Sequence, residues 1–331
     1  MRRLGRLTAG LAAVTALSVG ASGCVTVHGE LEVLPGATES EAAQALEDFT
    51  AAYNEADKAY DPALDADRVT GSLGAINQAG LKARRKTGPG GNAAHKPLEL
   101  TDADFVIPKK VGWPRWFLAD TDSNRDEDGG KLDTRWLLVF VRTGPDTPWK
   151  AAYLAAVAPS RVPEFRKDAD GWAEPVPSAE TDEVLATAPA ELSRTYTAYL
   201  EKGAPDVFAP GATTSGWRDA RKNVRRAGFS YQYIDQPLDE GDFAPLGLRT
   251  KDGGALVFFS SRHFERQTAA EGLRPTVTPD VRALLTGEVK STLTKERVSS
   301  QLVHVPERGD GDADKVSVLN RLPGLVAAEG S

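Results

Sequence analysis

Helical and strand-like apolar patterns occupy separate blocks of this 331-residue chain, and the same order of blocks occurs twice. In the first half, apolar residues recur at intervals of three or four from Ala42 to Tyr60, and a second helical segment covers 68–85. The second half starts again with a helix from Pro189 and another near 217–226. Runs rich in Val, Leu, Phe and Trp follow each pair of helices. Because helices and strands are segregated, the sequence predicts an α+β fold with antiparallel sheets.

Clusters of Pro, Gly and Asp mark the ends of the expected strands and of the expected domains. The strands expected in the first half are 98–107, 113–119, 134–142 and 149–158. Those expected in the second half are 229–234, 243–250, 255–265, 288–305 and 315–328, with a short helix over 279–286. These elements predict two tandem helix–helix–antiparallel-sheet domains, 38–158 and 189–331. A linker rich in Pro, acid and Ala, 159–188, either without regular structure or with a short strand over 172–176, is expected to join them. The order of the strands is left open.

The N-terminus has the three-part pattern of an export signal. Three arginines among the first six residues precede an uncharged apolar run from Leu7 to Ala21, and small residues lead to Cys24. The run is shorter than the roughly 20 residues that a transmembrane helix needs. Cys24 is the only cysteine, so it forms no internal disulfide. Its position is similar to that in a bacterial lipobox, although Ala21 replaces the usual Leu; a plain secretory signal with an incidental cysteine is the alternative.

The lipobox interpretation makes 1–23 a signal peptide and 24–37 a lipidated tether, with the protein held at the extracytoplasmic face of the cell membrane by acyl chains on Cys24. The whole chain has a net charge of −7, and removing the arginine-bearing signal makes it more acidic. An acidic chain argues against nucleic acid as a partner. Basic clusters at 82–86 and 218–226 are either helix ends over a solvated face or a contact for an anionic wall polymer.

The stretch DTDSNRDEDGGKLD, residues 120–133, raises the possibility of a metal site. Oxygen-bearing side chains stand at every second position: Asp120, Asp122, Asn124, Asp126 and Asp128. Alternating oxygen ligands in a tight loop suit calcium. In an EF-hand, however, the sixth position is Gly and the twelfth is Glu, and here Arg125 and Lys131 occupy them. Strand-like segments also flank the loop, so the two interpretations are a weak calcium site and the acidic tip of a hairpin; no other cofactor is indicated.

Histidine supplies the one grouping that suggests catalysis. The four histidines are His28, His95, His263 and His304. On the expected strand, Ser261, His263 and Glu265 share one face, which is compatible with acyl transfer by a surface hydrolase that uses His263 and Glu265. The alternative is a solvent-facing stripe, because residues two apart stand side by side and no oxyanion hole is indicated. No G-x-S-x-G, H-E-x-x-H, C-x-x-C or P-loop motif occurs, so no catalytic residue is assigned.

Tryptophan could instead mark a sugar-binding surface. Trp116 and Trp136 lie in nearly continuous apolar runs, WFLA and WLLVFV, which are typical of buried strands. Core packing therefore accounts for them, and His304 on its expected strand is given a structural role. Trp113, beside Pro114, is the best candidate for an exposed ring.

Two resemblances follow from these patterns. The repeated order of helices and strands is similar to the cone-shaped nuclear-transport-factor-2-like and cystatin-like α+β domains, in which an apolar pocket often lies between helix and sheet. Nearly the whole chain also resembles a group of actinobacterial secreted lipoproteins of uncharacterised function. The stretches that carry this second resemblance are DFTAAYNEADKAYDPALDADRVTG (48–71), WPRWFLADTDSNRD (113–126), TRWLLVFVR (134–142), DGGALVFFSSRHFERQTA (252–269) and LTKERVSSQ (293–301).

The resemblance to secreted lipoproteins implies export, lipidation and a two-part mature region, and implies no activity. The sequence therefore favours a membrane-anchored extracytoplasmic lipoprotein that acts as a non-enzymatic binding or scaffold module. Its expected partners are membrane lipid through Cys24 and an envelope protein or wall polymer. The alternatives are the hydrolase based on His263 and Glu265, and a solute-binding lipoprotein, which predicts an open cavity between the halves.

Overall fold

The computed structural model describes residues 32–177, 184–309 and 314–331. Its helices and mainly antiparallel sheets, in which the short strand 285–287 pairs in parallel with 328–330, confirm the predicted α+β class. The predicted signal peptide, Cys24 and His28 lie outside the described residues. Within the described ranges, no helix is long and apolar enough to cross a membrane.

The first half opens with two helices. α1 (Glu39–Ala59) starts at a capping box, in which the Thr38 hydroxyl accepts a hydrogen bond from the Glu41 N–H at 3.1 Å. The Glu41 carboxylate accepts one in return from the Thr38 N–H at 2.9 Å. A 3-10 turn, η2 (Pro62–Leu64), leads to α2 (Gly71–Thr87).

A four-stranded antiparallel sheet follows in the order β2-β4-β5-β6. Its strands are β2 (Leu100–Val106), β4 (Arg115–Ser123), β5 (Arg135–Arg142) and β6 (Lys150–Val157). Phe117, Leu138 and Phe140 face α1, whereas Leu118 and Leu137 face the second half. Both faces are thus buried, which explains the nearly continuous apolar runs. Beside this sheet, β1 (Val33–Pro35) pairs with β3 (Lys109–Val111).

The second half is built on a longer, seven-stranded sheet. Its order is β11-β13-β12-β10-β9-β7, and β8 pairs with β10. The strands are β7 (Pro175–Val176), β8 (Phe229–Leu238), β9 (Leu246–Arg249), β10 (Ala255–Ala269), β11 (Leu285–Gly287), β12 (Thr292–Val305) and β13 (Ser317–Gly330). The helices are α3 (Leu192–Lys202), α4 (Ser215–Asn223) and α5 (Pro279–Leu284), with 3-10 turns η3 (Pro159–Arg161), η4 (Pro189–Glu191) and η5 (Gly241–Phe243).

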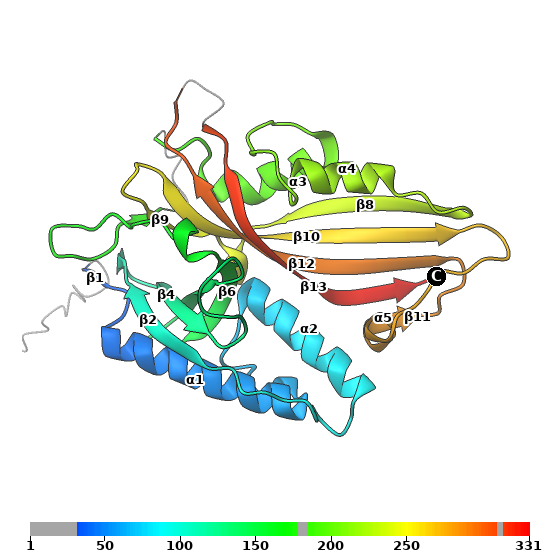
Figure 1. Cartoon of the computed structure of the whole chain (residues 1–331), viewed down its shortest axis with the longest axis horizontal. Helices are drawn as coiled ribbons and strands as arrows, with labels where there is room; N and C mark the ends of the chain where they lie inside the picture. Colours follow the sequence, from blue (N-terminus) through cyan, green and yellow to red (C-terminus); the bar gives the residue numbers. More distant parts are fainter. Residues whose placement is uncertain (1–31, 178–183, 310–313) are drawn as a thin grey trace, which may run out of the picture.

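The long sheet carries different elements on its two faces. Figure 1 shows α3 and α4 on one side, whereas α2 and the first half lie on the other. On the first side, Tyr196 of α3 packs against Phe259 of β10, with their ring centroids 5.7 Å apart. On the second side, Ile76 of α2 contacts the backbone of Gly324 in β13. Both faces of the long sheet are therefore covered, one by α3 and α4 and the other by α2 and the first half.

In the segment expected as a linker, the described residues 159–177 and 184–188 pack against both halves. Its part β7 pairs with β9, and Ala173, Val176 and Leu185 are buried. One apolar cluster contains Leu118 and Leu137 of the first half together with Leu256, Phe258 and Leu302 of the second. One buried cluster thus joins the two halves, and the division into two tandem domains with a linker stays a prediction.

Two glycines beside this junction predict opposite effects on stability. A Cβ on Gly324 would lie 2.4 Å from Ile76 Cγ2, so Gly324→Ala is expected to lower the free energy of unfolding by about 1–3 kcal/mol. A Cβ on Gly80, inside α2, would meet only Arg84 Nη2 at 3.6 Å. Gly80→Ala is therefore expected to raise the free energy of unfolding by about 0.5–1 kcal/mol.

Urea denaturation of both variants beside the wild-type chain measures this pair of effects. If Gly324→Ala and Gly80→Ala shifted the urea midpoint equally and in the same direction, the close approach of β13 to α2 would be contradicted.

Candidate functional site

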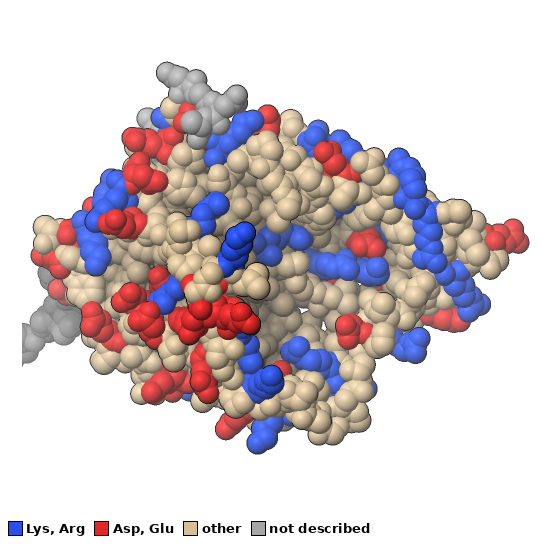
Figure 2. All heavy atoms as spheres, in the orientation of Figure 1, with Lys and Arg blue, Asp and Glu red and all other residues tan. Residues whose placement is uncertain are grey.

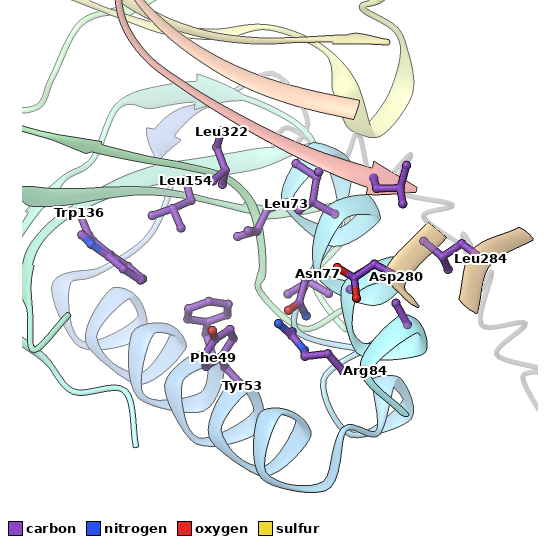
Figure 3. Close-up of a pocket in the computed structure, with 16 residues that line it drawn as sticks. Phe49, Tyr53, Leu73, Asn77, Arg84, Trp136, Leu154, Asp280, Leu284 and Leu322 are labelled. Carbon is purple, nitrogen blue, oxygen red and sulfur yellow. The ribbon is translucent and has the colours of Figure 1, made fainter. Parts of the chain in front are cut away.

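A cavity of about 500 Å³ lies where the two halves meet. We call it the junction cavity. It is bounded by α1, α2, β5, β6, α5 and β13, and Figure 3 shows the side chains that point into it. Its apolar lining consists of Phe49, Val69, Leu73, Ile76, Ala83, Trp136, Leu154, Leu284, Leu322 and Leu325. Figure 2 shows the surface hollowed between the helical part and the long sheet. A partly open, mainly apolar cavity of this size is typical of a small-molecule site.

Polar groups are concentrated at one end of the junction cavity. Asn77, Arg84 and Asp280 lie together at the α2–α5 end, whereas Trp136 lies at the opposite end (Figure 3). The Asn77 amide is held by the Asp65 carboxylate. Arg84 lies over the Tyr60 ring, 5.7 Å from its centroid, and its buried Nε has no hydrogen-bond partner. A buried donor without a partner favours a ligand that supplies an acceptor.

Tyrosine adds one more polar group to the wall. Burial, and then the nearby Asp57 carboxylate, raises the pKa of the Tyr53 phenol. The phenol is therefore a neutral hydroxyl at physiological pH, able to donate or accept a hydrogen bond. The cavity thus presents an apolar body, one cationic donor and few other polar groups.

Sequence patterns identify few of the residues that line this cavity. Trp136 was expected to be a core residue, but it is half-buried and lines the cavity, whereas Trp116 is buried as expected. The sequence places Arg84 in the basic cluster 82–86 and does not predict that it lines a cavity. The remaining walls come from α5 and β13, some 200 residues away in sequence, and their contact with α2 could not be inferred without the strand order. Trp113, the expected exposed tryptophan, is exposed.

His263 occupies a second polar site, on the opposite face of the long sheet. Its Nδ1 lies 2.6 Å from Asp235 Oδ1, and its Nε2 lies 2.8 Å from the hydroxyl oxygens of both Ser261 and Ser299. Burial lowers the pKa of His263 to about 4, so the neutral ring donates from Nδ1 to Asp235. The hydrogen bonds from His263 and Arg221 hold the pKa of Asp235 below its usual value, against the effect of burial.

The serines complete this network. The Gln301 amide nitrogen donates to the carbonyls of Phe259 and Ser299, both at 3.0 Å. Its oxygen lies 2.6 Å from the Ser261 hydroxyl and 2.8 Å from the Ser299 hydroxyl. His263 Nε2 and Gln301 Oε1 are thus both acceptors within reach of both serines, and each serine donates to one of them. The two serine hydroxyls, the His263 ring and the Gln301 amide are all satisfied, as most buried polar groups are.

This geometry changes the hydrolase hypothesis. Asp235 and Ser299 come from distant segments and lie on opposite nitrogens of His263, Asp235 at Nδ1 and Ser299 at Nε2. This is the carboxylate–histidine–hydroxyl arrangement that acyl transfer uses. Glu265 is not the partner of His263, because it pairs with Lys295 at 2.9 Å and Arg297 at 3.4 Å. Both hydroxyls are 0% exposed and His263 is 3% exposed, so no substrate reaches a nucleophile in this state. The arrangement is typical of a buried structural network.

The structure also separates the candidate calcium ligands. Asp120 and Asp122 belong to β4 rather than to the loop, and β4 and β5 form a hairpin around 124–134. Asp120 pairs with Arg135 at 2.7 Å, Asn124 bonds to the backbone of Pro97 and Glu99, and Asp126 accepts from Thr134. Asp128 is exposed. Within the described ranges, no group of three or more His, Cys, Asp or Glu side chains is arranged to hold a metal ion.

The remaining described histidines have ordinary partners. His95 Nδ1 lies 2.8 Å from Asp57 and holds the loop after α2 to the end of α1. His304 Nε2 lies 3.1 Å from Asp252 in the β9–β10 turn. The contact of His304 agrees with the structural role expected for it, and His95 has a similar contact.

Comparison with known proteins assigns the chain to a family. A family model described as "Domain of unknown function (DUF8094)" matches residues 33–330. The chain belongs to the DUF8094 family. This match spans both halves, including 159–188, so the family is defined by the whole described fold and not by one half of it.

Relatives occur in Streptomyces. The chain is 56% identical to "Uncharacterized lipoprotein SCO2278" of Streptomyces coelicolor, over 99% of this chain and 97% of that protein. It is 53% identical to an "Uncharacterized lipoprotein" of Streptomyces avermitilis, over 100% and 97%. A second S. coelicolor protein, "Uncharacterized lipoprotein SCO6871", is 26% identical over 63% of this chain and 59% of its own length. The expected membership of an actinobacterial lipoprotein group is confirmed.

No solved structure matches the chain significantly. The resemblance of this DUF8094 member to nuclear-transport-factor-2-like and cystatin-like domains therefore stays a prediction.

The buried His263 predicts a specific dependence of stability on pH. The folded pKa, about 4, lies below the ordinary value of 6.5, so unfolding takes up a proton between these values. The free energy of unfolding is expected to fall by about 3 kcal/mol from this group as the pH drops from 6.5 to 4. In His263→Gln this part of the slope should disappear.

Chemical denaturation across this pH range checks the prediction, with the partly exposed His304→Gln as a control that keeps the slope. Carboxylates also titrate there, so the measure is the difference between the proteins. An identical slope in wild type and His263→Gln would contradict it.

Proposed function

We propose that this protein is a lipid-anchored binding protein of the extracytoplasmic membrane face, which holds a small amphiphilic molecule in the junction cavity. The observation that carries the proposal is the cavity itself, about 500 Å³ of mainly apolar space with its polar groups gathered at one end. This shape accommodates an apolar body with a single polar head. Of the roles considered from the sequence, solute binding between the halves is the one that this cavity supports.

Anchoring rests on two observations. Cys24 is the only cysteine and follows an export-type segment, and the Streptomyces relatives carry the name lipoprotein. Two thioether- or ester-linked acyl chains would hold the chain stably, because each buried CH₂ contributes about 0.8 kcal/mol. A binding cavity tethered at a membrane surface lies close to membrane-derived amphiphiles.

The preferred head group follows from Arg84. Its buried Nε lacks a partner, so an anionic or strongly accepting head would satisfy it. The Asp280 carboxylate at the same end disfavours a head with two negative charges. We therefore infer a ligand with one acidic group, such as a monocarboxylate, on an apolar body. The hydrolase alternative is weaker, because the Ser261 and Ser299 hydroxyls are enclosed.

Replacing Cys24 tests the anchor. Cys24→Ser removes the sulfur that would carry the acyl chains, so the protein is expected to move from the membrane fraction to the medium. Immunoblotting of washed membranes and of culture medium measures the distribution. Retention in membranes equal to wild type would contradict lipid anchoring through Cys24.

The released Cys24→Ser protein allows ligand binding to be measured without detergent. We expect an anionic naphthalene dye to bind with increased fluorescence, and decanoate to displace it. Ala83→Leu places extra carbons in the cavity and should abolish binding, whereas Ala59→Leu, exposed at the end of α1, should not. Arg84→Met should weaken dye binding about tenfold, the value of a lost charge-assisted hydrogen bond.

Arg85→Met is the matched control for Arg84→Met. Arg85 is adjacent, loses the same charge, and is a surface partner of Asp61 at 2.6 Å. The proposal fails if the dye does not bind, or if Ala83→Leu and Ala59→Leu bind it equally. Equal affinity of Arg84→Met and Arg85→Met would contradict the assigned head-group position.

A further inference from the structure

The face of β13 that points away from the junction cavity lines a second, smaller cavity. Leu322 and Gly324 face the junction cavity, whereas Arg321 and Pro323 face the layer formed by α4. The smaller cavity has a volume of about 180 Å³ and lies between α4 and strands β8, β10, β12 and β13. A water needs only about 10–15 Å³ of such space, so a polyatomic group fits.

Trp217 contacts three of the charged or polar side chains at this cavity. The Trp217 ring of α4 has the Arg221 guanidinium 3.6 Å and the Arg321 guanidinium 3.8 Å from its centroid. The His263 ring meets it edge-on, with the ring centroids 4.9 Å apart. Both cations therefore contact the same aromatic ring. Each such contact contributes about 0.5–2 kcal/mol, and together they fix the position of both guanidinium groups.

The two arginines differ in their partners. Arg221 forms an ion pair with Asp235 at 2.7 Å, and both side chains are buried. Arg297, at the same cavity, is 3.4 Å from Glu265, which is also bonded to Lys295. Arg321 has the Trp217 ring, but within the described residues it forms no ion pair. The Nε atoms of both Arg221 and Arg321 are buried and have no hydrogen-bond partner.

The unpaired cation is costly. Burial, and the nearby positive charges, lower the pKa of Arg321 to about 10, so it still carries its charge at physiological pH. A ring face screens a cation but offers no lone pair to the N–H donors of a guanidinium. The Arg321 Nε is buried without an acceptor, so no protein group compensates its desolvation, and a bound anion would supply the missing acceptor.

The charges around the cavity leave a positive excess. The guanidinium groups of Arg221, Arg297 and Arg321 face the carboxylates of Asp235 and Glu265. Lys295 adds a further positive charge at Glu265, and His263 is neutral. Asp235 is fully engaged by His263 and Arg221, and Glu265 by Lys295 and Arg297. The local charge is thus complementary to an anion and not to a cation.

We propose that the cavity beneath α4 is a binding site for a small oxyanion group, a phosphate or a carboxylate, with Arg321 as its principal donor. The fork of N–H donors on a guanidinium matches the oxygens of either group. The site is distinct from the junction cavity and does not depend on the function proposed for it. Arg297 and Glu265 are partly exposed, so the cavity can be reached from solvent without passing through the apolar core.

Titration of the full chain in a neutral detergent tests this site. Inorganic phosphate and acetate, each at constant ionic strength against chloride, distinguish a tetrahedral from a planar group. Glycerol phosphate shows whether the group binds as part of a larger molecule. Isothermal titration and the shift of the unfolding midpoint measure binding. Saturable binding of at least one of the three, with a rising midpoint, is the expected result.

Arg321→Met should weaken that binding about tenfold or more, since a charge-assisted hydrogen bond is lost. Arg266→Met is the matched control: it lies on β10, is exposed, and removes the same charge. If Arg321→Met does not fold, Arg321→Lys keeps the charge without the fork and should bind measurably more weakly than wild type. No binding of any anion to wild type, or wild-type affinity in the folded Arg321 variant, would overturn the proposal.

Discussion

The packing of the four-stranded sheet against the long sheet is the contact on which the rest of the molecule depends. Leu118 and Leu137 meet Leu256 and Phe258 in one buried cluster, and no disulfide is available to replace this contact, since the chain has one cysteine. The fully buried Tyr153 of β6 reinforces it, because its hydroxyl donates toward the carbonyls of Phe243 and Ala244 at 2.8 and 2.9 Å. Joining the halves in this way places α2 beside β13, and the junction cavity is the space that the two leave between them.

β13 connects the two candidate sites through the alternation of its side chains. Successive residues of a strand point to opposite faces, so Leu322 belongs to the apolar cavity and Arg321 to the cationic one. Gly324 continues the pattern on the α2 side, where any Cβ would collide with Ile76. A slip of one residue in the pairing of β12 with β13 would exchange these faces and bury Arg321 among leucines. The register of this one strand therefore decides the chemistry of both cavities.

Local features of the fold could be predicted from the sequence, but long-range pairings could not. Thr38 and Glu41 form the capping box at the start of α1, as their spacing indicates, because a cap needs only neighbouring residues. Asp235 could not be recognised as the partner of His263, because that contact depends on β8 pairing with β10. Glu265 was the nearer carboxylate in sequence but is held by Lys295, across the β10–β12 pair. The residues that line the junction cavity could not be identified for the same reason, since its walls come from distant regions of the chain.

The attachment of α4 shows how the polar network serves the fold. No residue of α4, which lies wholly within the described chain, is fully buried, so apolar burial alone does not hold this helix. Instead, the Trp217 ring contacts the guanidinium groups of Arg221 and Arg321, and Arg221 forms an ion pair with Asp235 on β8. Asp235 in turn fixes the His263 ring, which meets the edge of Trp217. The helix, the histidine and the buried serines therefore form one connected set of contacts, in which a lost charge on Asp235 would leave Arg221 and His263 without an acceptor and loosen α4 from the sheet.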